Sequence, residues 1–258
     1  MEAMSFARDL ARRAGELALE IRRDGNLDIE QKTAEAQNIV TRADRACEEL
    51  IAAAIRQRYP NHAVRGEEGV ANQAGSRWQW IIDPIDGTYN FSRGRIFSVS
   101  IGLAHDGESV AGALFFPDDA VLLSATRGGG ADRNGTRIER SSVVKLADAR
   151  LAFDVSAGGD EVREIASYRQ PLEAHVASVE RTYCSTSAAR GIIEGTYDAH
   201  ICGGLTPYDI AAAIVILREA GCAVACIDQK HIDIDREKIP LIMAADPQLL
   251  EEIETLVL

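Results

Sequence analysis

Two aspartates three residues apart follow an apolar run in the segment Trp80-Ile81-Ile82-Asp83-Pro84-Ile85-Asp86-Gly87-Thr88. The apolar run predicts a buried strand, which Pro84 is expected to stop, and Gly87 permits a tight turn. Asp83 and Asp86 are therefore expected at a strand end, beside free N–H groups at the start of a helix. Carboxylate oxygens suit a small divalent cation, and such N–H groups suit a phosphate. Asp and Gly also build ordinary turns, so this segment alone leaves a purely structural role open.

A second acidic segment lies upstream, where Glu67 and Glu68 stand between Gly66 and Gly69. Adjacent glutamates flanked by glycines are typical of a solvated surface turn. They also suit a site in which one carboxylate binds a metal and the other orients the groups around it.

Two further aspartates stand at expected helix starts. Asp44 follows Thr41 by three residues in a capping-box pattern, ahead of an amphipathic helix. Asp209 follows Thr206 in the same way, ahead of an apolar helix that is expected to end at Gly221. Each aspartate therefore has a complete explanation as a helix cap, and a second role is compatible with capping.

The order of these segments resembles the inositol monophosphatase family, a branch of the lithium-sensitive, magnesium-dependent phosphatases. The resemblance covers nearly the whole chain, and four acidic elements in the family's order carry it. The matching segments are Lys32, Val40-Thr41 with Asp44, Gly66-Glu67-Glu68, Asp83-Pro84-Ile85-Asp86-Gly87-Thr88 with Asn90-Phe91, and Tyr208-Asp209-Ile210-Ala211-Ala212 with Glu219-Ala220-Gly221.

The family implies an α/β fold, a layered α-β-α-β-α sandwich of the inositol monophosphatase and fructose-1,6-bisphosphatase type. The sequence pattern agrees with it through a helix over 5–23, alternating strands over 97–126, a hairpin at 134–135, and mixed strands and helices beyond residue 150. We expect residues 1–258 to form one domain, with a metal-rich part over about 1–145 and an α/β part over about 146–258.

The resemblance also implies two to three Mg²⁺ ions. Glu67, Asp83 and the carbonyl of Ile85 would hold the first ion. Asp83, Asp86 and Asp209 would hold the second, and a third, weaker ion would share Glu67. Small hard cations bind such oxygen ligands and retain water for a substrate phosphate.

Catalytic roles follow from the same resemblance. Thr88, hydrogen-bonded to Asp44, would activate the attacking water together with Glu67, while Glu68 and Lys32 would support the metal ligands. The residues expected to contact the substrate are Gly87, Thr88, Asp86, Ala188 and Asp209.

The implied function is hydrolysis of a small phosphorylated polyol, such as inositol 1-phosphate. Three departures from the family's pattern concern the substrate side. The family's inositol-contacting glutamate falls on Cys202, a usual glycine is Thr186, and a usual tryptophan is Tyr208. An alternative is therefore a phosphatase for a 3′-phosphoadenosine nucleotide, histidinol phosphate or a sugar bisphosphate. A third possibility is a regulatory protein that binds the transcription machinery, as some bacterial relatives do.

Composition narrows the partners. The 258 residues carry a net charge of −12, which disfavours direct binding to nucleic acid or to an anionic membrane. The start of the chain has mixed charge rather than the pattern of a signal peptide, and the apolar runs are too short to span a membrane, so we expect a cytoplasmic protein. Five scattered cysteines predict buried free thiols. A homodimer is expected from the family, and Gly128-Gly129-Gly130 is a weak candidate for a phosphate loop.

Overall fold

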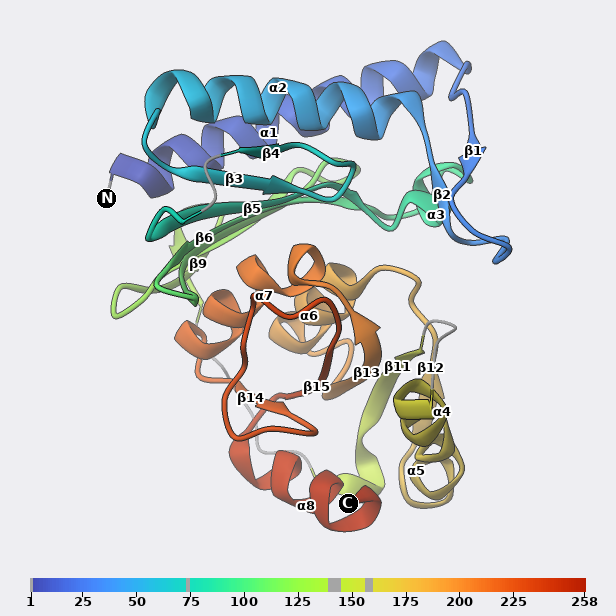
Figure 1. Cartoon of the computed structure of the whole chain (residues 1–258). Coiled ribbons are helices and arrows are strands. Elements are labelled where there is room, and N and C mark those ends of the chain that lie inside the picture. Colours follow the sequence, from blue (N-terminus) through green and yellow to red (C-terminus); the bar gives the residue numbers. More distant parts are fainter. Residues whose placement is uncertain (1, 73–74, 139–144, 156–159) are drawn as a thin grey trace.

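The computed structural model describes residues 2–72, 75–138, 145–155 and 160–258. In this part of the chain, helices and sheets alternate in five layers (Figure 1). A pair of helices covers an eight-stranded sheet, a second pair separates that sheet from a five-stranded sheet, and further helices cover the far side. The predicted α-β-α-β-α sandwich is therefore confirmed.

The first layer contains α1 (Glu2–Asp24) and α2 (Arg42–Arg58). Both are amphipathic, and their apolar faces share one core with the eight-stranded sheet. The prediction of a helix over 5–23 is confirmed. Between the two helices, β1 (Glu30–Gln31) and β2 (Ile39–Val40) pair antiparallel, and this small hairpin reaches the edge of the site described below.

The larger sheet has the order β10-β9-β8-β7-β6-β5-β3-β4, and all its pairs are antiparallel except β3 with β5. The predicted strands over 97–126 and the hairpin at 134–135 are present. The strands are β3 (Ala63–Gly66), β4 (Ala71–Asn72), β5 (Trp78–Asp86), β6 (Ser98–His105), β7 (Glu108–Phe116), β8 (Val121–Thr126), β9 (Gly130–Arg133) and β10 (Thr136–Arg137).

The expectation that Pro84 stops the strand at residue 82 is wrong, because β5 continues to Asp86. Asp83 pairs with Ser100 and Asp86 pairs with Ser98, so β5 has one residue more than its partner over this stretch. Such a bulge accommodates a proline, which has no N–H to donate to the ladder. It also matters for the site, because residues three apart on a regular strand would point to opposite faces.

The middle layer contains α6 (Ser185–Glu194) and α7 (Pro207–Glu219). α7 is buried along most of its length and contacts strands of both sheets. A Cβ added at Gly102 would lie 2.8 Å from the Cβ of Ala211, and one added at Gly112 would lie 2.6 Å from the Cα of Ala212. These two glycines therefore let α7 lie directly on the sheet, which fixes the position of its first turn.

The smaller sheet has the order β12-β11-β13-β15-β14, with β11 parallel to β12 and β13 and the other pairs antiparallel. Its strands are β11 (Arg150–Val155), β12 (Ser178–Glu180), β13 (Ala199–Leu205), β14 (Ala223–Cys226) and β15 (Ile239–Ala244). Its outer face packs in a third core against α4 (Asp160–Ser167), α5 (Arg169–His175) and α8 (Pro247–Val257). The remaining helices are α3 (Thr88–Phe91) and a 3₁₀ turn at Leu146–Asp148.

Other features of the described residues bear on the sequence predictions. All five cysteines are buried free thiols, as predicted. No described helix is long and apolar enough to cross a membrane. The N–H groups of Gly128 and Gly130 are already bound by the carboxylate of Glu219, at 2.7 and 2.6 Å, which argues against a phosphate loop there. The single domain and its division near residue 145 stay predictions.

Candidate metal and phosphate site

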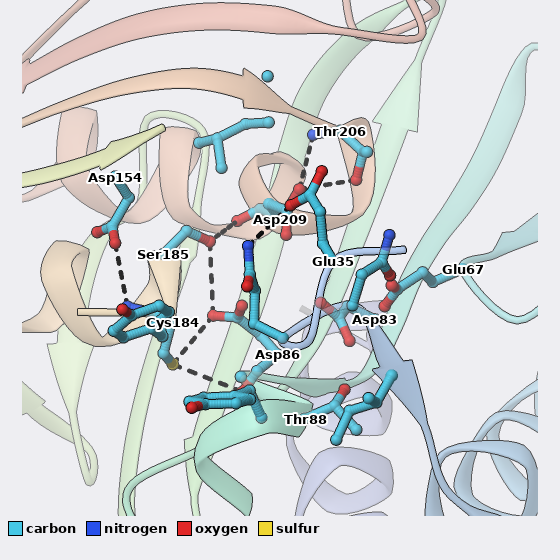
Figure 2. Close-up of a pocket in the computed structure, with 18 of the residues that line it drawn as sticks. Glu35, Glu67, Asp83, Asp86, Thr88, Asp154, Cys184, Ser185, Thr206 and Asp209 are labelled. Carbon is cyan, nitrogen blue, oxygen red and sulfur yellow. Dashed lines mark hydrogen bonds between the residues drawn. The ribbon is translucent and has the colours of Figure 1, made fainter. Parts of the chain in front are cut away.

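A cavity of about 460 Å³ lies where the end of β5, the start of α3, the start of α6 and the start of α7 meet (Figure 2). The ends of β11 and β13 form the opposite wall. The metal ligands predicted from the sequence, Glu67, Asp83, Ile85, Asp86 and Asp209, all line this cavity.

Three aspartates come together on one side of the cavity. Asp83, Asp86 and Asp209 each offer an oxygen within 4.8 Å of the others. Burial raises the pKa of Asp83 well above its usual range, and the neighbouring carboxylates raise it further. Burial and the same repulsion raise the pKa of Asp209 to about 7. This cluster therefore requires protons or cations, and its oxygen-only donor set fits Mg²⁺.

Local structure explains how these carboxylates meet. The bulge in β5 brings Asp83 and Asp86 toward the same cavity. Asp209 is the third residue of α7, where its Oδ2 accepts hydrogen bonds from the N–H and hydroxyl of Thr206 at 2.6 and 2.7 Å. The predicted cap is therefore real, and it orients Asp209 at the cavity.

Glu67 and Glu68 follow β3, and Lys32 from the β1–β2 hairpin lies between them. Its Nζ is 3.1 Å from Glu67 Oε1 and 2.7 Å from Glu68 Oε1. Burial alone would lower the pKa of Lys32, but the two carboxylates raise it above its usual value. Burial and the charge of Glu67 raise the pKa of Glu68 to about 7. The ammonium group thus offsets part of the acidic charge at this end of the site.

Asp44 uses its two carboxylate oxygens for two different contacts. Oδ2 accepts from the N–H and hydroxyl of Thr41, at 2.8 and 2.6 Å, as a helix cap. Oδ1 lies 2.9 Å from the hydroxyl of Thr88, which also lies 3.0 Å from the carbonyl of Ile85. Burial raises the pKa of Asp44 to about 6, although these hydrogen bonds oppose the rise. Capping and the predicted contact with Thr88 therefore coexist.

The turn into α3 places backbone donors beside the aspartates. Gly87 has a φ of 84°, and a Cβ at this position would lie 2.9 Å from that of Cys184, so the turn needs a glycine. Gly87 is the N-cap of α3 and Thr88 is its first residue, so their N–H groups have no partner within that helix. Both residues line the cavity.

Comparison with known proteins agrees with this geometry. The model of the inositol monophosphatase family matches residues 1–257. This chain belongs to the inositol monophosphatase family.

Individual relatives carry two kinds of name. The chain is 32% identical over 244 residues to the Nus factor SuhB of Pseudomonas aeruginosa, with 92% of this chain and 89% of that protein covered. It is 31% identical over 264 residues to the inositol monophosphatase of Dictyostelium discoideum, with 99% and 94% covered. Among solved structures, the suhB protein of Bartonella henselae superposes with a TM-score of 0.89 at 26% identity, covering 100% of this chain and 98% of that one.

The opposite wall contains charged residues that the sequence did not reveal. Asp154, Arg181 and Lys238 line it, as does Tyr183. Asp154 accepts hydrogen bonds from the N–H groups of Thr182 and Tyr183, both at 3.0 Å. The position of Asp154 near the end of β11 could have indicated a place at the site, because neighbouring parallel strands bring their carboxyl ends to one edge of a sheet. Glu35, from the β1–β2 hairpin, also lines the cavity.

The residue at the place of the family's inositol-contacting glutamate, Cys202, and one predicted substrate residue, Ala188, are not among the residues that line the cavity. Cys202 is fully buried in β13 among the residues that pack on α7, and its Sγ lies 3.4 Å from the carbonyl of Leu241. It does not line the cavity, so it is not placed to contact a substrate bound there. Its side chain points to the inner face of the sheet, and the irregularity between Cys202 and Leu205 follows only after it. Ala188 is also fully buried, in α6, and is not among the cavity-lining residues.

The other two departures have structural roles. Thr186 is fully buried and contacts Asp86 rather than forming a wall of the cavity. The hydroxyl of Tyr208 accepts a hydrogen bond from Arg65 at 3.3 Å, and both residues line a different cavity.

Proposed function

We propose that this protein is a magnesium-dependent phosphomonoesterase. The observation that carries the proposal is the group of three aspartates with oxygens within 4.8 Å, in a cavity that Thr88 and the Gly87 turn also line. Such a site has too much negative charge to admit a phosphate alone, and cations would remove that obstacle.

The metal ligands keep the assignments given above. Glu67, Asp83 and the carbonyl of Ile85 would hold one ion, and Asp83, Asp86 and Asp209 would hold the second. A third ion would share Glu67, where Lys32 now provides positive charge. When bound, Mg²⁺ supplies positive charge that polarises the phosphate and lowers the pKa of water.

The chain's own groups would position the reactants. The Thr88 hydroxyl donates a hydrogen bond to Asp44 Oδ1, so the Thr88 oxygen would accept a hydrogen bond from the attacking water. The N–H groups of Gly87 and Thr88 would donate to the phosphate. Glu67, at the open end of the site, would take up the water proton, and Glu68 with Lys32 would hold Glu67 in place.

The substrate is proposed to be a small phosphorylated polyol, such as inositol 1-phosphate. The wall opposite the aspartates, formed by the ends of β11 and β13, is called the leaving-group wall below, and it supports one alternative in particular. Arg181 and Lys238 line it, and each donates to a backbone carbonyl, of Val155 and Gly204 respectively, at 3.0 Å. An ammonium has three donors, so this contact does not exhaust Lys238. A substrate with a second anionic group, such as a sugar bisphosphate or a 3′-phosphoadenosine nucleotide, fits such a wall.

Phosphate release from a substrate panel tests the proposal. The panel contains inositol 1-phosphate, glycerol 2-phosphate, fructose 1,6-bisphosphate, adenosine 3′,5′-bisphosphate and histidinol phosphate, each with Mg²⁺ and after chelation. We expect hydrolysis only with Mg²⁺, inhibition by Li⁺, and inhibition by high Ca²⁺. Full activity of a chelated preparation would overturn the proposal.

The relatives named SuhB bear on a third possibility, a protein that binds the transcription machinery. If no member of the panel is hydrolysed while the protein binds Mg²⁺, this possibility takes precedence. We also propose a homodimer, which light scattering after gel filtration would test.

A further inference from the structure

Asp86 presents its two carboxylate oxygens to very different surroundings. Oδ2 accepts a hydrogen bond from the N–H of Thr186 at 2.7 Å and a second, short one from the Thr186 hydroxyl. The thiol of Cys184 lies 3.2 Å from the same oxygen, and the hydroxyl of Ser185 lies 3.5 Å from it. Among the described residues, none donates a hydrogen bond to Oδ1.

A second buried hydroxyl fixes the direction of the short contact. Ser98 Oγ lies 2.6 Å from the Thr186 hydroxyl, and both residues are fully buried. Each hydroxyl has one proton. If Thr186 donates to the carboxylate, which can only accept, then Ser98 donates to Thr186. The result is a chain of hydrogen bonds from β6, through the first turn of α6, to Asp86.

We propose that Thr186 is a positioning residue that occupies one oxygen of Asp86, confines the carboxylate to one-oxygen metal binding, and thereby favours Mg²⁺ over Ca²⁺. The inference rests on the proposed metal site.

The selectivity follows from coordination chemistry. Ca²⁺ takes six to eight oxygens at about 2.3–2.6 Å and often binds both oxygens of one carboxylate. Mg²⁺ requires a near-octahedral shell at about 2.0–2.1 Å and binds carboxylates through single oxygens. Two-oxygen binding by Asp86 would break the two hydrogen bonds from Thr186 inside a buried site, which is costly. One-oxygen binding leaves them intact.

Metal binding to the purified, chelated full-length protein tests the inference without measuring activity. Isothermal titration with MgCl₂ and with CaCl₂ is compared for wild type, Thr186→Val and Thr186→Ser. Valine keeps the shape of threonine and removes the hydroxyl. We expect its Mg²⁺ affinity to fall about tenfold, the lower end of the effect of losing a group that orients a ligand. Its Ca²⁺ affinity should fall less, so the ratio shifts toward Ca²⁺, and serine should restore the ratio.

Two further variants test whether the effect is specific to the hydrogen bonds that end on Asp86. Ser98→Ala removes the donor to Thr186 without touching the carboxylate, and it should shift the ratio in the same direction by a smaller factor. Ser124→Ala removes another fully buried serine hydroxyl, which is bonded to Arg8 and Asp132, and it should leave the ratio unchanged. Ser98→Ala also provides the test if Thr186→Val does not fold, as judged by circular dichroism.

The outcomes separate this inference from the proposed function. If the wild-type protein binds neither ion, the proposed function fails and this inference fails with it. If the wild-type protein binds Mg²⁺ but the ratio is the same in Thr186→Val, or in Ser98→Ala where that variant stands in for it, only the role of Thr186 is overturned. Equal losses for both ions would overturn it as well, because a merely structural role affects both alike.

Discussion

The two walls of the cavity treat a buried carboxylate in opposite ways. On the side of Asp83, Asp86 and Asp209, called the metal wall, burial and crowding raise the pKa of Asp83 and Asp209. A cation is needed there to balance the negative charge of the ionised carboxylates. On the leaving-group wall, burial also acts to raise the pKa of Asp154. There, His200 and the donors of Thr182 and Tyr183 outweigh it and hold the pKa at about 2.

The two walls differ in the hydrogen-bond donors and charges that the protein places around each carboxylate. Asp154 faces the imidazole of His200 at 3.1 Å, so the protein itself supplies its partners. The three clustered aspartates face one another, and the chain supplies fewer donors than they can accept. A carboxylate whose donors outweigh burial serves the structure, here the loop around Thr182, while crowded carboxylates whose donors do not offset their mutual repulsion indicate a site for an external cation.

The largest effect is expected at Asp83, which would be shared by two ions. Asp83→Asn keeps the size of the side chain and removes its charge, so activity should be abolished. In the absence of metal, the melting temperature should rise, because repulsion with its neighbours is relieved. Turnover with saturating Mg²⁺ and melting in a chelator are the two measurements. Asp154→Asn is the matched control on the other wall and should lower the melting temperature instead. Near wild-type turnover of Asp83→Asn would contradict the assignment.

The next effect concerns the two oxygens of Asp44. Serine tolerates a helix start but is too short to hold the Thr88 hydroxyl, so Asp44→Ser separates the two roles. We expect turnover to fall by roughly two to four orders of magnitude, the scale for losing a positioned proton-transfer partner. The loss of the cap itself should cost about 1 kcal/mol of stability. Thr41→Ser keeps the capping hydroxyl and serves as the control. Unchanged turnover of Asp44→Ser would show that Asp44 acts only as a helix cap.

The carboxylates of the two walls should also affect stability in different pH ranges. The folded pKa values of Asp44 and Asp209, about 6 and about 7, lie above the ordinary value of 3.8 for an aspartate. The folded metal-free protein therefore binds more protons than the unfolded chain in this range. Its stability should fall as pH rises through 6 to 7. Mg²⁺ competes with these protons, so the stabilisation by Mg²⁺ should grow between pH 5 and pH 8.

The leaving-group wall should titrate in a different range. The pKa of Asp154 is lowered, so its stabilising effect is present above pH 3.8 and is lost only as pH falls toward 2. Melting curves at several pH values, with Mg²⁺ and with a chelator, measure both effects. A Mg²⁺ effect independent of pH between 5 and 8 would contradict the raised pKa values.

Local patterns explain why much of this structure was predictable. The capping boxes at Thr41 and Thr206 and the strand before Asp83 each depend on residues within a few positions. The bulge at Pro84 was missed because the extra residue is visible only against the partner strand. The buried position of Cys202 was not predictable for a related reason, since the face that a strand side chain takes depends on its register in the sheet.

Contacts between segments far apart in the chain could not be predicted from the sequence patterns. Asp154, Arg181 and Lys238 are separated by dozens of residues and meet only because the end of β11, the end of β12 and the start of β15 lie at the same cavity. The contact between Thr186 and Asp86 spans 100 residues. Metal ligands were predictable because the family resemblance supplied this long-range information, whereas it assigned no role to Asp154, Arg181 or Lys238.

The smallest effect is expected at Arg181, where the two walls can be compared directly. Arg181 is partly exposed, and its Nε lies 3.8 Å from Asp154 Oδ1. If it recognises a second anionic group, Arg181→Gln should lower kcat/KM for fructose 1,6-bisphosphate by about two- to fivefold. A partly exposed ion pair contributes up to about 1 kcal/mol, which sets this scale. The value for glycerol 2-phosphate, which has one phosphate, should not change, because the metal wall is intact. Lys238→Gln is a parallel variant on the same wall. Equal losses for both substrates would show that Arg181 only supports the loop, and that the leaving-group wall does not select for a second anion.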